Sequence, residues 1–408
     1  MALIDRFLER FITRGTLTVA EAGRAPRTFG TPTPDWPDVA IRFADARVAR
    51  DIALHPRLGA AEAYMDGRLQ VENDDIMGLI TLIRGGQPWE AGGTIEDASL
   101  PSRAIGGARA RLDRLNWTAR SKRNVAHHYD LDDRLYSLFL DTDRQYSCAY
   151  YTGPANSLEQ AQADKKAHIA AKLALSPGQR VLDIGCGWGG MALYLHERAG
   201  VDVLGITLSE EQLKVARERA AAAGVADRVK FELIDYRNQT GRFDRIVSVG
   251  MFEHVGPPHY RRFFAKCRDL LADDGVMLLH TIGRMGGPGT TDAFTSKYIF
   301  PGGYIPALSE IVAASEQCRL IASDVETLRL HYAYTLRAWY ARTRAARAEI
   351  ERIYDARFYR MWLFYLAGAA TAFEHGGLCN YQLQYIRDRR ALPITRDYMV
   401  SAEAALRG

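Results

Sequence analysis

The residues with the clearest chemical potential form a glycine-rich turn, Val181-Leu-Asp-Ile-Gly-Cys-Gly-Trp-Gly-Gly190. A short apolar run leads into this turn, and Gly185, Gly187 and Gly189 follow at alternate positions. Because glycine has no Cβ, the backbone can bend sharply there and a ligand can approach it closely. Open α/β sheets bind ligands at the carboxyl ends of their strands, so the turn predicts a cofactor site. Dinucleotide-binding folds use similar turns, and the glycines alone do not identify the cofactor.

Two further details favour S-adenosylmethionine (SAM) over a dinucleotide. The spacing is G-x-G-x-G, whereas dinucleotide folds typically carry G-x-G-x-x-G. Asp183 also lies within the strand just before the turn, where a carboxylate can order the turn or attract a sulfonium and an amino group. Dinucleotide folds usually have an acid at the end of the second strand, but here that strand ends in Thr207-Leu-Ser. We therefore predict a SAM site.

Two residues beyond the turn have alternative interpretations. Ser209 and Gln212 show the S-x-x-Q spacing of a helix capping box, so Gln212 has a capping role, a role in the site, or both. Asp235 follows the third strand, a position that suits the adenine amino group in SAM-binding folds. The alternative for Asp235 is an ordinary turn aspartate.

The elements around these residues alternate between strand-like and helix-like patterns. Buried strands are expected at residues 181–184, 203–207, 229–234, 245–249 and 276–281. Helices are expected at residues 192–199 and 209–223, the second closed by Gly224. This order predicts an α/β class: a doubly wound, mostly parallel, Rossmann-like sheet, with a smaller domain before it.

The chain is long enough for more than one domain, and we predict three parts. Residues 1–85 form a lipid- or membrane-associated domain, 86–123 a glycine-containing basic linker, and 124–408 the SAM-dependent catalytic domain. The first helix carries Ile4, Leu8 and Phe11 on one face. This face either packs on its own domain or lies on a membrane. The linker is either a solvated connector or a contact for anionic lipid.

Composition narrows the class of protein. The formal net charge of +4 is too small to indicate a nucleic-acid partner. The five cysteines are scattered and form no C-x-x-C pair, so we expect free thiols and no metal site. Charges interrupt the N-terminus where a signal peptide would need an apolar core, and the longest uncharged apolar run, residues 361–373, is too short to span a bilayer. We expect a cytoplasmic protein.

The sequence resembles the cyclopropane-fatty-acyl-phospholipid synthase family, which includes the mycolic acid cyclopropane synthases. The likeness covers about residues 124–340 and includes the glycine turn, while the N-terminal region resembles the extra domain of the phospholipid-acting branch. Besides the turn, the family-like motifs occur in the expected order: His128-Tyr-Asp-Leu, Tyr146-Ser-Cys148-Ala-Tyr150, Met251-Phe-Glu253-His-Val-Gly256, Leu279-His280-Thr-Ile282-Gly283, Ile299-Phe-Pro-Gly-Gly303 and His331-Tyr332.

The resemblance implies roles for individual residues. Positions beside SAM in the family match Tyr146, Ser147, the turn glycines, Thr207 and Gln212. Positions of the family's bicarbonate pocket match Cys148, Glu253, His280, Ile282 and Tyr332. Taken individually, three of these have other interpretations: Glu253 as a solvated loop acid, Cys148 as a small buried residue, and His280 as a satisfied core histidine.

The resemblance also implies a reaction and a substrate. The SAM methyl group is transferred to a cis double bond of a phospholipid acyl chain, and bicarbonate serves as the base that closes a cyclopropane ring. The implied location is the inner face of a bacterial membrane, with peripheral attachment and a possible homodimer. Alternatives are a lipid methyltransferase that yields methyl-branched or methylene chains, a methyltransferase for a soluble small molecule, and a non-enzymatic lipid-binding module.

The basic linker generates a prediction about membrane attachment. Binding to anionic vesicles should weaken as salt rises, because salt screens the arginine side chains from the lipid headgroups. Deleting residues 1–120 should lower activity on vesicles more than it lowers SAM binding. Vesicle co-sedimentation across a salt series tests the first point, and salt-independent binding would contradict a role for the linker arginines.

Overall fold

The computed structural model describes residues 3–93 and 132–407. Most of the predicted basic linker and the motif that begins at His128 lie outside the described residues. The chain separates into two compact units. The first contains the described part of Met1–Ala110 with Thr291–Pro301 and Ala333–Leu378, and the second contains the remainder.

The first unit combines a small sheet with helices from both ends of the chain. Its four strands lie in the order β2-β1-β3-β4, with β1 parallel to β3. Its elements are α1 (Leu3–Phe11), β1 (Gly15–Glu21), β2 (Arg27–Thr31), β3 (Asp38–Phe43), α2 (Arg47–Leu54), α3 (Pro56–Met65), β4 (Leu69–Val71), α4 (Ile76–Gly85), most of α13 (His331–Ala345), α14 (Arg347–Ile353) and α15 (Ala356–Glu374).

The apolar face of α1 is buried within this unit. Ile4, Leu8 and Phe11 are each at most 5% exposed, so the interpretation that the helix packs on its own domain is confirmed. The alternative, in which this face lies on a membrane, is wrong because protein already covers those side chains. No helix in the described ranges is both long and apolar enough to cross a bilayer, and this includes α15, which holds the apolar run at residues 361–373.

The first unit also takes in chain segments that the linear division assigned to residues 124–408. Helix α15 packs on α3 and α4, and Phe294 and Ile299 join Ala61 and Met65 in one buried cluster. These contacts bury apolar side chains that the first 85 residues would otherwise leave exposed. The three-part division by function stays a prediction.

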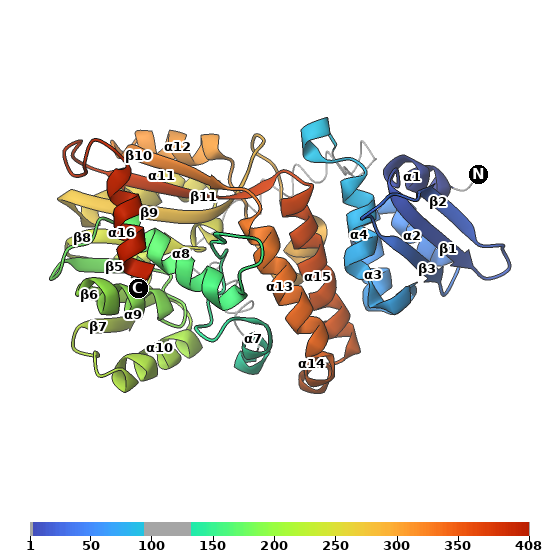
Figure 1. Ribbon diagram of the computed structural model, residues 1–408, viewed down its shortest axis with the longest axis horizontal. Coiled ribbons are helices and arrows are strands. Elements are labelled where there is room, and N and C mark those ends of the chain that lie inside the picture. The colour runs from blue at the N-terminus through green and yellow to red at the C-terminus, as the bar shows by residue number, and fades with distance from the viewer. Residues whose placement is uncertain (1–2, 94–131, 408) are drawn as a thin grey trace. The chain divides into compact units, whose positions relative to one another are not determined.

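The second unit is a seven-stranded sheet in the order β10-β11-β9-β8-β5-β6-β7 (Figure 1). Its strands are β5 (Arg180–Ile184), β6 (Asp202–Thr207), β7 (Val229–Leu233), β8 (Phe243–Val249), β9 (Leu271–Arg284), β10 (Ile321–Leu328) and β11 (Leu378–Ile386). Strands β5 to β9 pair in parallel, and β10 pairs antiparallel with β11. All five predicted strands and the mostly parallel, doubly wound class are confirmed.

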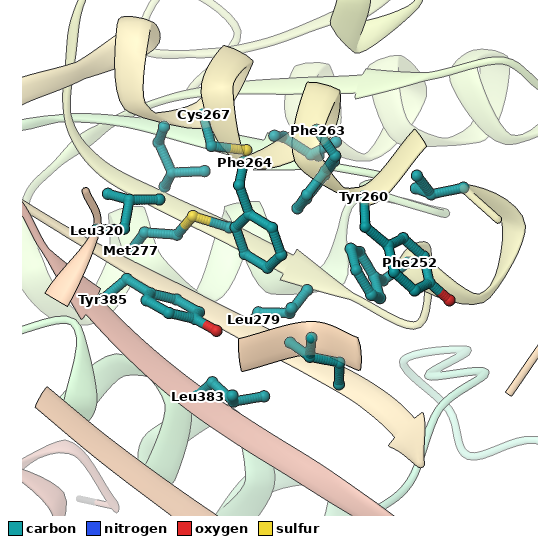
Figure 2. Packing of buried hydrophobic residues seen from close by; sticks show 14 of the residues in the cluster. Phe252, Tyr260, Phe263, Phe264, Cys267, Met277, Leu279, Leu320, Leu383 and Tyr385 are labelled. Atoms are coloured by element: carbon teal, nitrogen blue, oxygen red, sulfur yellow. The ribbon is translucent and has the colours of Figure 1, made fainter. Parts of the chain in front are cut away.

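Helices cover both faces of this sheet because adjacent strand residues point to opposite sides. Met277 and Leu279 face a core with α11 and α12, in which Phe252, Phe263 and Phe264 pack closely (Figure 2). The other core lies against α8, α9 and α10. The helices of this unit are α7 (Asp133–Phe139), α8 (Leu158–Lys172), α9 (Gly190–Ala199), α10 (Glu210–Ala222), α11 (Tyr260–Leu270), α12 (Leu308–Glu316) and α16 (Asp397–Arg407).

One histidine links α8, β10 and α16 through its contacts with two glutamates. The His168 imidazole on α8 bonds Glu326 of β10 at 2.7 Å and Glu403 of α16 at 2.8 Å. Burial opposes protonation of this ring, but hydrogen bonds to the two carboxylates raise the pKa of His168 above its ordinary value. The protonated ring is therefore the form that stabilises the fold.

We predict that His168→Ala lowers stability by about 2 kcal/mol near pH 6, because it removes a charged hydrogen-bond donor from two partly buried carboxylates, which keep Lys172 and Arg407 as partners. A histidine whose pKa is raised by folding contributes stability below its unfolded pKa of about 6.5, and this is lost as pH rises through the folded pKa. The gap between wild type and variant should therefore narrow toward about pH 9. Denaturant unfolding at both pH values is the measurement, with Glu403→Gln as a milder control. A pH-independent gap would show that the ring is neutral.

Candidate active site

The glycine turn joins β5 to α9 and requires left-handed backbone at three positions. The φ angles of Gly185, Gly187 and Gly189 are +86°, +54° and +84°. A Cβ at Gly187 would project into open space, so this residue presents bare backbone to the adjoining cavity. Gly189 does not line that cavity, since a Cβ there would lie 2.7 Å from the Phe231 ring. Gly189 thus allows close packing where α9 begins.

The cavity lies beside the carboxyl ends of β5, β6 and β7. It brings together eight of the nine residues predicted to bind the cofactor: Tyr146, Ser147, Asp183, Gly185, Gly187, Thr207, Gln212 and Asp235. They come from four separate stretches of the chain. Three of these stretches lie at or after the carboxyl ends of parallel strands, which meet at one edge of the sheet, and the fourth, with Tyr146 and Ser147, lies between α7 and α8.

Asp183 is a buried carboxyl that faces the cavity with an unused acceptor. The residue is 2% exposed, and within the described ranges its Oδ2 has no hydrogen-bond partner. Burial raises the pKa of Asp183 to about 7, because no nearby group fully replaces the lost water. A cationic or amino donor at this place would satisfy the carboxyl, and SAM offers both kinds of group.

The two residues with alternative interpretations each show local bonds as well as a cavity position. Ser209 Oγ accepts from the Gln212 amide at 3.3 Å, while the Gln212 Oε1 accepts from the Thr207 hydroxyl at 3.1 Å. Ser209 therefore caps α10, and the Gln212 side chain faces the cavity. Asp235 accepts from the Arg237 amide and guanidinium, as a turn aspartate does, and also lines the cavity.

Glu253 lies in a single helical turn, Phe252–His254, after β8. It is 8% exposed, so the interpretation as a solvated loop acid is wrong. The Ile282 amide on β9 donates to Glu253 Oε1 at 2.6 Å, and Oε2 has no partner within the described ranges. Burial raises the pKa of Glu253 to about 7, although the Ile282 hydrogen bond opposes this shift. The Ile282 amide thus fixes one oxygen of the carboxyl, and the other oxygen is buried without a hydrogen bond in the described part of the chain.

His280 lies two residues before Ile282 and faces β11. Its ring nitrogens lie 3.4 Å from the Asn380 amide nitrogen and 3.2 Å from that of Gln382. Burial lowers the pKa of His280 to about 3, so the imidazole is neutral. The oxygens of both amides have no partner within residues 3–93 and 132–407, which leaves buried acceptors beside the ring.

A second contact links the segments of Cys148 and Tyr332. The Tyr151 amide donates to His331 Nδ1 at 2.9 Å, and the Tyr150 ring stacks on both His331 and His168. Cys148 is 1% exposed, and burial raises the pKa of its thiol, which is therefore neutral. Cys148 thus has the burial that its structural interpretation requires.

A residue that the sequence analysis missed adjoins this site. The Lys165 ammonium on α8 donates to Gln145 Oε1 at 2.6 Å and to Ser147 Oγ at 2.8 Å, and both acceptor residues line the cavity. The polar run Asp164-Lys165-Lys166 is typical of a solvated helix face, so the sequence offers no signal of this burial. In the described part of the chain, no cluster of three or more metal-ligating side chains occurs.

Comparison with known proteins agrees with this geometry. The family model described as mycolic acid cyclopropane synthetase matches residues 117–383. The chain belongs to this family. It is 41% identical to the cyclopropane-fatty-acyl-phospholipid synthase of Escherichia coli K12, covering 85% of this chain and 87% of that protein. It is 37% identical to a probable fatty acid methyltransferase of Pseudomonas putida, and the match covers 89% of this chain and 92% of that protein.

Solved structures of family members share the fold of the second unit. The mycolic acid cyclopropane synthase CmaA1, solved with SAH and CTAB, is 33% identical and covers 65% of this chain and 97% of its own, with a TM-score of 0.62. The cyclopropane synthase MmaA2 from Mycobacterium tuberculosis is 32% identical, and the match covers 66% of this chain and 99% of that chain, with a TM-score of 0.63. The SAM-dependent, lipid-modifying family that the motifs predicted is therefore confirmed.

The glycine turn of this family member yields a prediction about affinity. Gly187→Val should weaken SAM binding at least about tenfold, or about 1.4 kcal/mol, because its side chain would occupy the cavity. Gly224→Val is the matched control, since Gly224 also has a positive φ of +68° and open surroundings but does not line the cavity. Titration calorimetry on folded variants is the measurement, and equal affinities for SAM would mean that the turn is misassigned.

Proposed function

We propose that this protein transfers the methyl group of SAM to a cis double bond in an acyl chain of membrane phospholipid and closes a cyclopropane ring, with bicarbonate as the base. The observation that carries the proposal is the Glu253 carboxyl. It is buried, held by the Ile282 amide on one oxygen and unpartnered on the other within the described ranges. Such a group can accept a proton in a site that excludes water.

SAM, when bound, supplies a methyl group made electrophilic by a sulfonium. Asp183 would hold its cationic end, Thr207 and Gln212 would bind polar groups, and Asp235 would accept from the adenine amino group. An alkene is a weak nucleophile, so the site must hold the acyl chain close and dry. The Tyr146 ring, which packs edge-on against Tyr136, lines the cavity and can stabilise positive charge that develops on the chain.

Ring closure requires that a proton leave the transferred carbon. Bicarbonate, when bound, would supply the base for this proton. Glu253 would orient that anion through the oxygen that the Ile282 amide leaves unused, and would accept the proton in turn. His280, Tyr332, Cys148 and the Ile282 segment would form the pocket for this anion. The naming of the E. coli relative as a cyclopropane-fatty-acyl-phospholipid synthase supports this substrate and product.

A second candidate is a lipid methyltransferase that gives methyl-branched or methylene chains. Similarity to the P. putida fatty acid methyltransferase, and to the M. tuberculosis tuberculostearic acid methyltransferase at 33% identity, favours it. The two candidates share every step up to proton loss. Incubation with SAM and vesicles of monounsaturated phospholipid, followed by product NMR, separates them by the upfield cyclopropane methylene signals. Peripheral attachment to the inner membrane face and a homodimer belong to the proposal as well.

We predict that Glu253→Gln leaves SAM affinity nearly unchanged and lowers turnover by about 10²- to 10⁴-fold, because glutamine keeps the size but cannot accept a proton. Removing bicarbonate should slow the wild type similarly and add little further loss in the variant, since the two groups act as one unit. Asp183→Asn is the contrasting variant and should weaken SAM binding. A fully active Glu253→Gln, or a wild type that never yields a cyclopropane signal, would contradict the assignment and favour the second candidate.

A further inference from the structure

Gly190, the last residue of the glycine-rich turn, differs from the three glycines before it. It does not have a positive φ angle, and it does not line the cavity. A Cβ at Gly190 would lie 2.5 Å from Asp143 Oδ2 and 2.4 Å from Gln145 Nε2. The absence of a side chain here therefore lets the Asp143 carboxylate and the Gln145 amide lie directly against the backbone where α9 begins.

The Asp143 carboxylate is held in this place by cations from two helices. Lys166 of α8 donates to its Oδ2 at 2.6 Å, and Arg219 of α10 donates to its Oδ1. The Gln145 amide also donates to Oδ2, at 2.9 Å. Burial opposes ionisation of Asp143, but the charges of Lys166 and Arg219 hold its pKa below the ordinary value, so the carboxylate is charged. It therefore joins both helices to the segment of Gln145, which lines the cavity.

Arg219 also bonds the turn itself. Its Nη1 donates to the Trp188 carbonyl oxygen at 2.9 Å, while its Nη2 donates to Asp143. Trp188 lines the cavity, but neither Arg219 nor Asp143 does. The two charged side chains therefore hold the turn from outside the cavity, at the Trp188 carbonyl and at the start of α9.

The composition of the turn makes such contacts important for ligand binding. Four of the six residues 185–190 are glycine, which loses more backbone freedom on ordering than any other residue. If the turn were loose in the free protein, the cofactor would have to order it on binding, and its affinity would fall by that cost. Contacts that order the turn beforehand remove the cost without touching the ligand.

We propose that Arg219 and Asp143 are positioning residues for the cofactor, which fix the glycine turn at the Trp188 carbonyl and at Gly190 before SAM binds. This inference rests on the proposed function only in that SAM is the ligand of the cavity. It gives Gly190 a role that the spacing of the turn does not provide. It also makes cofactor affinity depend on two side chains that do not line the cavity.

The test is the affinity for S-adenosylhomocysteine (SAH), measured by calorimetry without turnover. We expect Arg219→Met to weaken SAH binding about tenfold, because the turn must then be ordered by the ligand. Arg219→Lys keeps a charged donor and should recover part of the affinity.

Arg228→Met is the matched control. Arg228 likewise joins a carboxylate, that of Asp202, to a backbone carbonyl, that of Gly200. These contacts lie at the amino end of β6, whereas the cavity lies at the carboxyl ends of the strands. Arg228→Met should therefore bind SAH as the wild type does.

Hydrogen exchange separates a loosened turn from a general loss of stability. Without ligand, the amides of residues 185–190 should exchange faster in Arg219→Met than in the wild type, while those of β8 and β9 keep their protection. Saturating SAH should restore protection to the turn. Gly190→Ala should show the same loss of affinity and protection, because its Cβ displaces Asp143, although helix propensity alone would favour alanine in α9.

The outcomes distinguish the inference from the proposed function. A wild type that does not bind SAH would overturn the SAM site and the inference together. A wild type that binds SAH, with equal affinity in Arg219→Met, would overturn the inference alone. Loss of protection throughout the sheet in Arg219→Met would also overturn it, since Arg219 would then support the fold in general rather than the turn.

Discussion

The hydrogen bond from the Ile282 amide to Glu253 joins the extended end of β9 to the turn after β8. The two strands pair in parallel with Val249 opposite His280, and this register sets where the Ile282 amide points. A slip of one residue would turn that amide away, because successive strand residues face opposite sides. The apolar cores on both faces of the sheet hold the register. The packing of these cores therefore determines whether the Ile282 amide reaches the Glu253 carboxyl.

The same dry surroundings bring three ionisable groups toward neutral pKa values. Burial raises the pKa of Asp183 and of Glu253 to about 7 and lowers that of Lys165 to about 8. Each group is only partly compensated by its hydrogen bonds, so each is sensitive to charge brought in by a ligand. Groups with pKa values near 7 or 8 can gain and lose protons near neutral pH, as the proposed chemistry would require.

Strands β5 to β9 of the second unit could be predicted from the sequence, whereas β10 and β11, at one edge of the sheet, could not. The strands from Val181 to Thr281 are apolar runs next to glycine or polar turns, which is the pattern of a buried parallel strand. Strand β11 was not predicted, because Asn380, Gln382 and Gln384 alternate with apolar residues and so break the apolar run that marks a buried strand. All three are nevertheless buried. Glu253 was found only through the family resemblance, since a lone acid in a loop carries no local signal. Lys165 was missed because its burial depends on tertiary packing that α8 alone does not reveal.

The composition of the first unit has a consequence for the order of folding. Its α3 and α4 are completed by α15, and Met65 shares a buried cluster with Ile299. A ribosome adds roughly 5 to 20 residues per second, so the N-terminal segment waits on the order of tens of seconds for its partners. During that interval the apolar faces of α3 and α4 are not yet packed against α15. Chains that expose apolar surface in this way aggregate or bind chaperones. The second unit, encoded largely in between, has most of its sheet synthesised before the first unit is complete.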